Sequence, residues 1–225
     1  MKKAIILFLS IFLSTTCWSE DVLNIRVADL PPQYFQNEQG IWTGIDVELA
    51  RALVERAGFT PNFQKLPWTR ALREMETGRL LQVMASLSIT DERLQYMHFL
   101  GVERESRVRL IVKKEHRSLN ISNVDDLCNQ KMTFGILKGA FYGSELNKRI
   151  SNDEAFASCF TASVETHHNI LKTIKNRVMG FLEEELTMEY EIRTNPAYQE
   201  LAIHPFVVSN ETLFFGVTKK IDIST

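Results

Sequence analysis

The chain has 225 residues, of which 44% are hydrophobic and 24% are charged, and its 26 basic and 28 acidic side chains leave a formal net charge of −2. This is the composition of a globular protein, and it provides no cationic surface for the phosphate backbone of a nucleic acid. No apolar run reaches the roughly 18 residues that a membrane-spanning helix needs. We therefore expect neither a nucleic-acid-binding protein nor an integral membrane protein.

The N-terminus has the order of a secretory signal peptide. Two lysines precede an apolar run over residues 4–13, and small or polar residues follow it. We expect cleavage after Ser19, which makes residues 1–19 the signal peptide and places the mature chain in the periplasm. Lipoprotein processing at Cys17 is the alternative, although the preceding Ser-Thr-Thr lacks the apolar residue expected there.

Two cysteines remain after this cleavage, Cys128 and Cys159. An exported protein lives where thiols oxidise, so we expect a disulfide between them, and two separate buried thiols are the alternative. The wide spacing, the lack of a CxxC pair and the adjacent His167 and His168 match no familiar zinc-ligand spacing. We expect no metal site and no cofactor.

From residue 23, strands and helices alternate in the order typical of a parallel sheet covered by helices. One helix carries apolar residues on one face and ends at Gly58, and the next ends at Gly78. The elements expected in this half are strands at 23–28, 62–66 and 81–86, helices at 45–57 and 69–77, and a short helix opened by Thr90.

An extended stretch at residues 106–112 leads into a polar segment at 113–123, which we interpret as a connection between two lobes. Beyond it the alternation starts again, which predicts a second α/β lobe rather than a repeat protein. The elements expected there are strands at 132–137, 159–162, 178–182, 202–207 and 213–217, and helices at 140–149, 165–176 and 186–192.

The junction Ser86-Leu-Ser-Ile-Thr-Asp-Glu-Arg93 is the first candidate for a ligand site, because ligands of open α/β sheets sit where strands feed helix N-termini. Thr90 is a good N-cap, but Arg93 places a cation at the positive end of a helix. A bound carboxylate would compensate this charge, held by Arg93 and by the hydroxyls of Ser86 and Ser88. A solvated arginine paired with an adjacent acid is the alternative.

Two further junctions follow in the second half. The turn at residues 135–143 contains Gly139, whose bare backbone can approach an anion, and a purely structural turn is the alternative. Three glutamates at 183–185 directly follow an apolar strand. A solvated loop is the plain interpretation, whereas one glutamate turned inward would neutralise a bound ammonium and complement Arg93, so that the pair would recognise a zwitterion.

Aromatic side chains near these junctions could form the walls of the site: Tyr34, Trp42, Trp68, Phe141 and Tyr142. Trp68 could stack on an aliphatic or cationic group, or belong to the core. The five histidines show no spacing to a nucleophile, and no GxSxG, HExxH or reactive-cysteine signature is present. We therefore do not expect an enzyme.

These motifs together resemble the polar amino-acid branch of the periplasmic solute-binding proteins, family 3, along nearly the whole mature chain. The matching segments are residues 44–49, 86–93, 98–99, 106–110, 135–139 and 177–190. The resemblance implies an α/β fold with two lobes, type II-like, in which each lobe is a mostly parallel sheet flanked by helices. Two hinge crossings join the lobes, which close around a small solute.

The resemblance also implies roles for single residues. Arg93 matches the arginine that holds the ligand carboxylate, and Glu184 falls where an aspartate commonly receives the ammonium. Trp68 falls where an aromatic covers the ligand side chain, and Asp29 where an acid can meet a distal cation. With Tyr142 from the aromatic walls, the expected ligand-binding residues are Arg93, Ser86, Ser88, Glu184, Trp68, Asp29 and Tyr142.

Some positions depart from the family pattern. Phe141 stands where a Ser or Thr usually helps hold the carboxylate, Pro32 stands near an expected aromatic wall, and Leu81 replaces a common aspartate. Glutamate at position 184 is one methylene longer than the usual aspartate and would crowd a standard α-amino acid. These departures favour a divergent subgroup and leave open a solute other than a standard amino acid.

The expected division of the chain follows the family. Residues 1–19 are the signal peptide, 20–111 the first segment of lobe 1, 112–210 lobe 2, and 211–225 a strand that returns to lobe 1. The family adds C-terminal helices after this strand, so we expect apolar surface on lobe 1 that they would cover, with low stability or association as the consequence.

The expected function is the binding of a small zwitterion or carboxylate by lobe closure, with an ABC permease as the partner that the resemblance implies. An enzyme on the same scaffold is one alternative, a dehydratase-like lyase with one of the glutamates at 183–185 as the proton donor. A truncated, non-binding signalling relative is the other.

Overall fold

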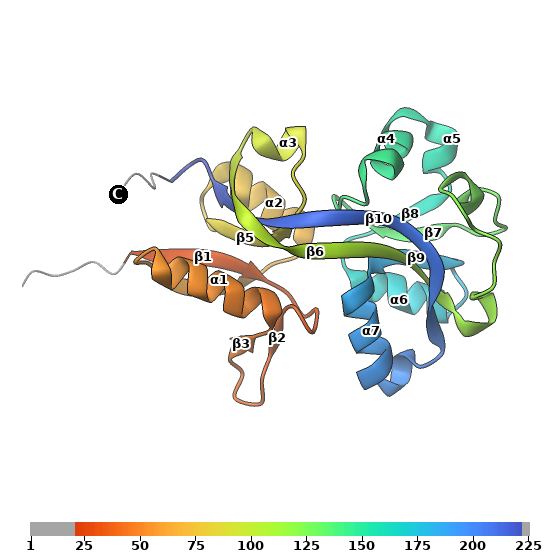
Figure 1. The fold of residues 1–225 in the computed structure, drawn as a ribbon, viewed down its shortest axis with the longest axis horizontal. Helices are drawn as coiled ribbons and strands as arrows, with labels where there is room; N and C mark the ends of the chain where they lie inside the picture. The colour runs from red at the N-terminus through yellow and green to blue at the C-terminus, as the bar shows by residue number, and fades with distance from the viewer. Residues whose placement is uncertain (1–20, 222–225) are drawn as a thin grey trace, which may run out of the picture.

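The computed structural model describes residues 21–221, and the predicted signal peptide lies outside the described residues. The chain forms two α/β lobes, and two long strands run from one lobe to the other (Figure 1). The first lobe contains β1 (Val22–Val27), β2 (Phe35–Gln36), β3 (Trp42–Thr43), α1 (Ile45–Arg56), β4 (Thr60–Lys65), α2 (Trp68–Thr77), β5 (Val83–Leu87) and α3 (Asp91–Leu94).

The second lobe begins with short turns of 3₁₀ helix and continues with a smaller sheet and its helices. Its elements are η1 (Lys114–His116), η2 (Asp125–Leu127), β7 (Phe134–Leu137), α4 (Ser144–Asn152), α5 (Glu154–Ala157), β8 (Phe160–Ser163), α6 (Thr166–Ile174), β9 (Gly180–Glu184), α7 (Glu185–Thr194) and η3 (Pro196–Tyr198). The crossing strands are β6 (Met97–Lys113) and β10 (Leu201–Thr218).

The sheet order is β4-β1-β5-β10-β6-β9-β7-β8. β1 pairs in parallel with β4 and β5, and β7 pairs in parallel with β8 and β9, so each lobe has the parallel sheet that the alternating pattern predicted. The crossing strands pair antiparallel with each other and with β5 and β9. Residues at the ends of β5 and β9 therefore meet close to the crossing.

The two crossing strands are longer than the sequence indicates. Separate strands were expected at residues 202–207 and 213–217, whereas β10 is continuous and pairs with β6 through Asn210 and Arg107. The polar residues between the two expected strands lie at the crossing, where no core covers them, so they show no apolar periodicity. The lobe boundaries at residues 111 and 210 stay predictions, since both strands pass through both lobes.

The polar segment at 113–123 is not the connection between lobes, so that prediction is wrong. Ile121, Val124 and Leu127 are buried in the core of the second lobe together with β6 and β7 side chains. Within the segment itself, Leu119 and Ile121 join this core, which is too few residues to give a helix or strand period. β6 itself makes the first crossing.

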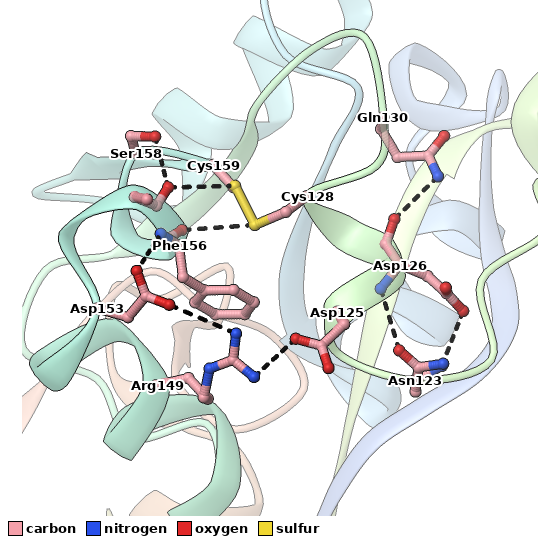
Figure 2. Close-up of a disulfide and its surroundings, with 11 residues drawn as sticks. Asn123, Asp125, Asp126, Cys128, Gln130, Arg149, Asp153, Phe156, Ser158 and Cys159 are labelled. Atoms are coloured by element: carbon pink, nitrogen blue, oxygen red, sulfur yellow. Dashed lines mark hydrogen bonds and ion pairs between the residues drawn. A yellow bond between two sulfur atoms is a disulfide. The ribbon is translucent and has the colours of Figure 1, made fainter.

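The predicted disulfide is confirmed. Cys128 and Cys159 are bonded, with 5.3 Å between their Cα atoms, and the bond ties the end of η2 to the residue before β8 (Figure 2). Beside it, the Arg149 guanidinium lies 4.5 Å from the Phe156 ring centroid and pairs with Asp125 at 2.7 Å. These contacts hold η2, which follows the polar segment, against the rest of the second lobe.

Local signals for helix ends are also confirmed. Thr90 caps α3 by accepting a hydrogen bond from the Arg93 amide at 3.2 Å, and Gly78 ends α2 in the left-handed conformation at φ 67°. Within residues 21–221, no helix is both long and apolar enough to cross a membrane.

Candidate functional site

A cavity of about 750 Å³ lies between the two lobes, within the range of small-molecule sites. Side chains from both lobes line it, including those at the ends of β5 and β9. All seven residues expected to bind ligand are in its wall: Asp29, Trp68, Ser86, Ser88, Arg93, Tyr142 and Glu184. The cavity therefore lies at the strand-to-helix junctions, and a ligand-binding role for these residues stays a prediction.

Arg93 is 5% exposed and is one of the residues that line the cavity. Nη1 donates to the Ser88 carbonyl at 2.8 Å and Nη2 to the Gly139 carbonyl at 3.2 Å. Of the carboxylates in residues 21–221, none is hydrogen-bonded or ion-paired to Arg93. Burial is the largest influence on the pKa of Arg93 and lowers it despite the attraction of Tyr96 and Glu92, so the loss of hydration of this cation is only partly compensated.

Gly139 connects the lobes through its carbonyl oxygen. Besides Arg93 Nη2, the Trp68 Nε1 donates to it at 2.9 Å, and the Trp68 ring centroid lies 5.6 Å from the Arg93 guanidinium carbon. The backbone here has φ +78°, which suits glycine. Two donors of the first lobe thus bind a carbonyl of the second, which holds the lobes together across one end of the cavity.

The two serines are used in different ways. The Ser86 hydroxyl donates to Asp46 and accepts from the Tyr34 hydroxyl at 3.1 Å, and the Ser86 amide donates to Glu103 at 2.6 Å. Ser88 is buried and positions Arg93 through its backbone carbonyl. The Ser86 side chain is therefore already engaged inside the protein, whereas no hydrogen bond of the Ser88 hydroxyl occurs among the described residues.

A charge network beside the cavity is centred on Arg104, which the sequence interpretation missed. From β6, Arg104 reaches Asp46 on α1, with 3.1 Å from Nε to Oδ1, and Glu184 on β9, with 3.0 Å from Nη2 to Oε2. Gln33 Nε2 donates to the same Glu184 oxygen at 3.0 Å. Burial lowers the pKa of Arg104, but the bonds to Glu184 and Asp46 outweigh it and raise that pKa overall.

Glu184 therefore has a cationic partner within the protein. It lies in the cavity wall as expected, but a solute ammonium would have to share this carboxylate with Arg104. Asp29 is likewise paired, with Lys65, and both of these side chains are exposed. No sequence spacing predicts either pair, because the partners are 80 and 36 residues apart.

Glu183 is a better candidate for a positive group of a solute. It is half-buried in the cavity wall and accepts hydrogen bonds from the Thr166 hydroxyl at 2.8 Å and the Glu184 amide at 2.9 Å. Burial raises the pKa of Glu183 to about 7. Across the described part of the chain no cation pairs with it. The sequence grouped this residue with its two neighbours and could not separate them.

The two remaining residues of this region have structural contacts. Glu185 pairs with Arg107 and Arg109 of β6 and joins α7 to that strand. The Tyr142 hydroxyl accepts from the Leu137 amide at 2.7 Å, and burial raises the pKa of Tyr142. Tyr142 thus lines the cavity with its hydroxyl already accepting a hydrogen bond from the backbone.

Residues 24–202 match the model of the bacterial extracellular solute-binding proteins, family 3. Among curated relatives, a probable amino-acid-binding protein, YxeM of Bacillus subtilis (strain 168), is 23% identical over 84% of this chain and 69% of its own length. The L-cystine-binding protein TcyJ of Escherichia coli (strain K12) is 29% identical over 47% of this chain. The match to TcyJ spans 40% of that protein's length, which is less than half.

Solved structures share the two-lobed fold. The amino acid ABC transporter substrate-binding protein AbpA from Streptococcus pneumoniae, bound to L-arginine, superposes with a TM-score of 0.75 and 20% sequence identity. The superposition covers 90% of this chain and 83% of AbpA. At this identity the likeness concerns the fold alone.

Proposed function

Because the chain belongs to the bacterial extracellular solute-binding proteins, family 3, we propose that it binds a small carboxylate or amino-acid-like solute between its lobes. One observation carries this proposal: Arg93 is a buried cation in the cavity wall with no carboxylate partner among residues 21–221. An acid group of the solute would neutralise the charge of Arg93 and accept hydrogen bonds from its remaining N–H groups.

The proposal extends to how the solute is held and used. The lobes close on the solute by bending at β6 and β10, and the Gly139 and Glu184 contacts across the cavity support this closure. The amino-acid-binding relatives support an amino acid or similar zwitterion. A periplasmic location, supported by the predicted signal peptide, and delivery to an ABC permease, supported by AbpA, are further parts of the proposal.

The test is a panel of amino acids, amines and organic acids added to residues 20–225 during thermal unfolding. We expect at least one carboxylate to raise the melting temperature, since a hundredfold excess over the dissociation constant stabilises by about 2.7 kcal/mol. Amines without an acid group should have no effect. The proposal fails if no compound stabilises the protein, or if only compounds without an acid group do.

The same samples distinguish binding from catalysis. We propose that the protein releases its solute unchanged, as the binding proteins among its relatives support. Mass spectrometry of the stabilising compound after long incubation should detect only the starting compound. A new product would favour the dehydratase-like alternative, with Glu183 as the first residue to test as a proton donor, because burial raises its pKa to about 7.

A solute that carries an amine should bind in a pH-dependent way through Glu183. The pKa of Glu183 is about 7 in the free protein, and a bound ammonium favours the ionised carboxylate. Below about pH 7 binding must therefore release a proton, so the affinity should fall by up to about tenfold per pH unit, and it should be level above pH 7.

Isothermal titration calorimetry between pH 5.5 and 8.5 measures this dependence. The control variant Glu183→Gln cannot ionise at this position and should flatten the profile. The matching acid that lacks the amine should also show a flat profile with the wild-type protein. An unchanged slope in Glu183→Gln would place the amine elsewhere.

A further inference from the structure

Arg26 lies where two aromatic rings form a cage. It is on β1 and 6% exposed, and its guanidinium carbon lies 5.4 Å from the Tyr34 ring centroid and 5.3 Å from the Trp68 ring centroid. Its Nε donates to the Leu66 carbonyl at 3.3 Å, and the residue is part of the cavity wall. The protein thus fills this cage with a cation of its own.

A filled cage changes which solute side chains can enter. Aromatic faces attract a cation within about 6 Å, and this attraction is strongest where water is excluded. Here Tyr34 and Trp68 already have that contact with Arg26. A solute with a guanidinium or ammonium at this end would meet a like charge instead of an open pair of rings.

No carboxylate of residues 21–221 is hydrogen-bonded or ion-paired to Arg26. The Asp46 carboxylate attracts it at longer range, but Asp46 is bonded to Arg104 and Ser86. Burial is the largest influence and lowers the pKa of Arg26 despite the attraction of Tyr34 and Asp46. Arg26 is therefore, like Arg93, a buried cation whose loss of hydration is only partly compensated.

The two uncompensated cations belong to one wall. The Arg26 and Arg93 guanidinium carbons lie 5.3 and 5.6 Å from the centroid of the same Trp68 ring, and both residues line the cavity. Asp29, the acid expected to meet a distal cation, is paired with Lys65. Apart from this Lys65–Asp29 pair, the wall of the first lobe thus offers two positive groups and no acidic one.

We infer that the solute carries two acid groups, one held by Arg93 and the other by Arg26, as in a dicarboxylate or an acidic amino acid. This inference rests on the proposed function and deepens it, because it assigns the chemistry of the second end of the solute. A solute of this kind differs from L-arginine, which the solved structure of AbpA contains.

The test compares pairs of compounds that differ in one charge. Calorimetric titration with glutamate, aspartate, succinate and glutarate, each beside its mono-amide, and with arginine, gives the required affinities. We expect one of the diacids to bind about 10- to 100-fold more tightly than its mono-amide, as for loss of a charge-assisted hydrogen bond. Arginine should bind more weakly than either.

The outcomes distinguish a failure of the second acid group from a failure of the proposed function. If a mono-amide or arginine binds as tightly as the best diacid, the inference of a second acid group is overturned and the proposed function stands. If no carboxylate in the series binds at all, both are overturned. These results come from the wild-type protein and do not depend on any variant folding.

Substitution of Arg26 should change the affinity for the diacid and for its mono-amide by different factors, which a purely structural role of Arg26 would not do. Arg26→Met should weaken the diacid about 10- to 100-fold and change its mono-amide less than about threefold. The variant should also bind arginine more tightly than the wild type does, because the Tyr34 and Trp68 rings become free for a solute cation. Arg26→Lys, which keeps the charge, should retain the preference for the diacid. Equal weakening of diacid and mono-amide would overturn the assignment.

The matched control is Arg73→Gln, which removes one positive charge from an exposed position on α2. It should leave all affinities unchanged at physiological salt, because exposed charges beyond about 8 Å are largely screened. A loss of diacid affinity in Arg73→Gln would mean that net charge, and not the Arg26 guanidinium, selects the solute, which overturns the inference.

Discussion

Replacing Arg93 with glutamine is expected to weaken the binding of every carboxylate solute by about 100-fold, the largest loss of affinity for any single residue of the cavity wall. Truncating one partner of a buried, hydrogen-bonded charge pair costs about 2–5 kcal/mol, and each 1.4 kcal/mol is tenfold in affinity. Diacids and their mono-amides should lose affinity equally, since the amide keeps the acid group that Arg93 holds. This separates Arg93 from Arg26.

Two further variants control for the contacts that Arg93 makes within the protein. Arg93→Lys keeps the charge but not the planar pair of donors, and it should retain part of the affinity. Trp68→Phe removes the other donor to the Gly139 carbonyl without a change of charge, and it should cost less than about tenfold. If Arg93→Gln binds within threefold of wild type, the acid group of the solute lies elsewhere.

The second large effect concerns stability. Arg104→Met should lower the free energy of unfolding by about 3–5 kcal/mol, the usual cost of leaving a buried carboxylate without its partner. Asp46 is 0% exposed and Glu184 is largely buried, so neither can recover its hydration when Arg104 is lost. Urea unfolding followed by circular dichroism gives the difference.

The matched control for Arg104 is Arg107→Met on the same strand. Arg107 is 53% exposed on its side chain, and its partner Glu185 keeps Arg109, so the loss should stay below about 1 kcal/mol. Adding Asp46→Asn and Glu184→Gln to Arg104→Met should recover a large part of the lost stability, because neither carboxylate of the Arg104 network then remains charged without its partner. Equal stability of the two arginine variants would contradict the role of Arg104.

The Arg104 network also bears on ligand binding. It joins α1 of the first lobe, the crossing strand β6 and β9 of the second lobe through the two carboxylates. A solute amine that bound Glu184 would weaken the Arg104 contact, whereas one that bound Glu183 would leave it intact. The geometry therefore favours Glu183 for a positive group, and the pH dependence described above tests that choice.

The sequence by itself determined the local features of this protein. Apolar periodicity located the helices and the parallel strands, Thr90 and Gly78 marked helix ends, and a predicted export signal together with two cysteines indicated the disulfide. The strand-to-helix motif that ends at Arg93 identified the family and the place of the cavity. Apart from the two cysteines, which are 31 residues apart, these signals are short in range and can be recognised within a few neighbouring residues.

Only the tertiary structure decided which charges remain open to a solute. Glu184 is paired with Arg104, Asp29 with Lys65, and Arg26 fills the space between Tyr34 and Trp68. The partners come from different strands and from both lobes, and no periodicity or spacing rule relates residues so far apart. The electrostatics of a cavity depend on distances between side chains in space, which are set when the lobes assemble around β6 and β10.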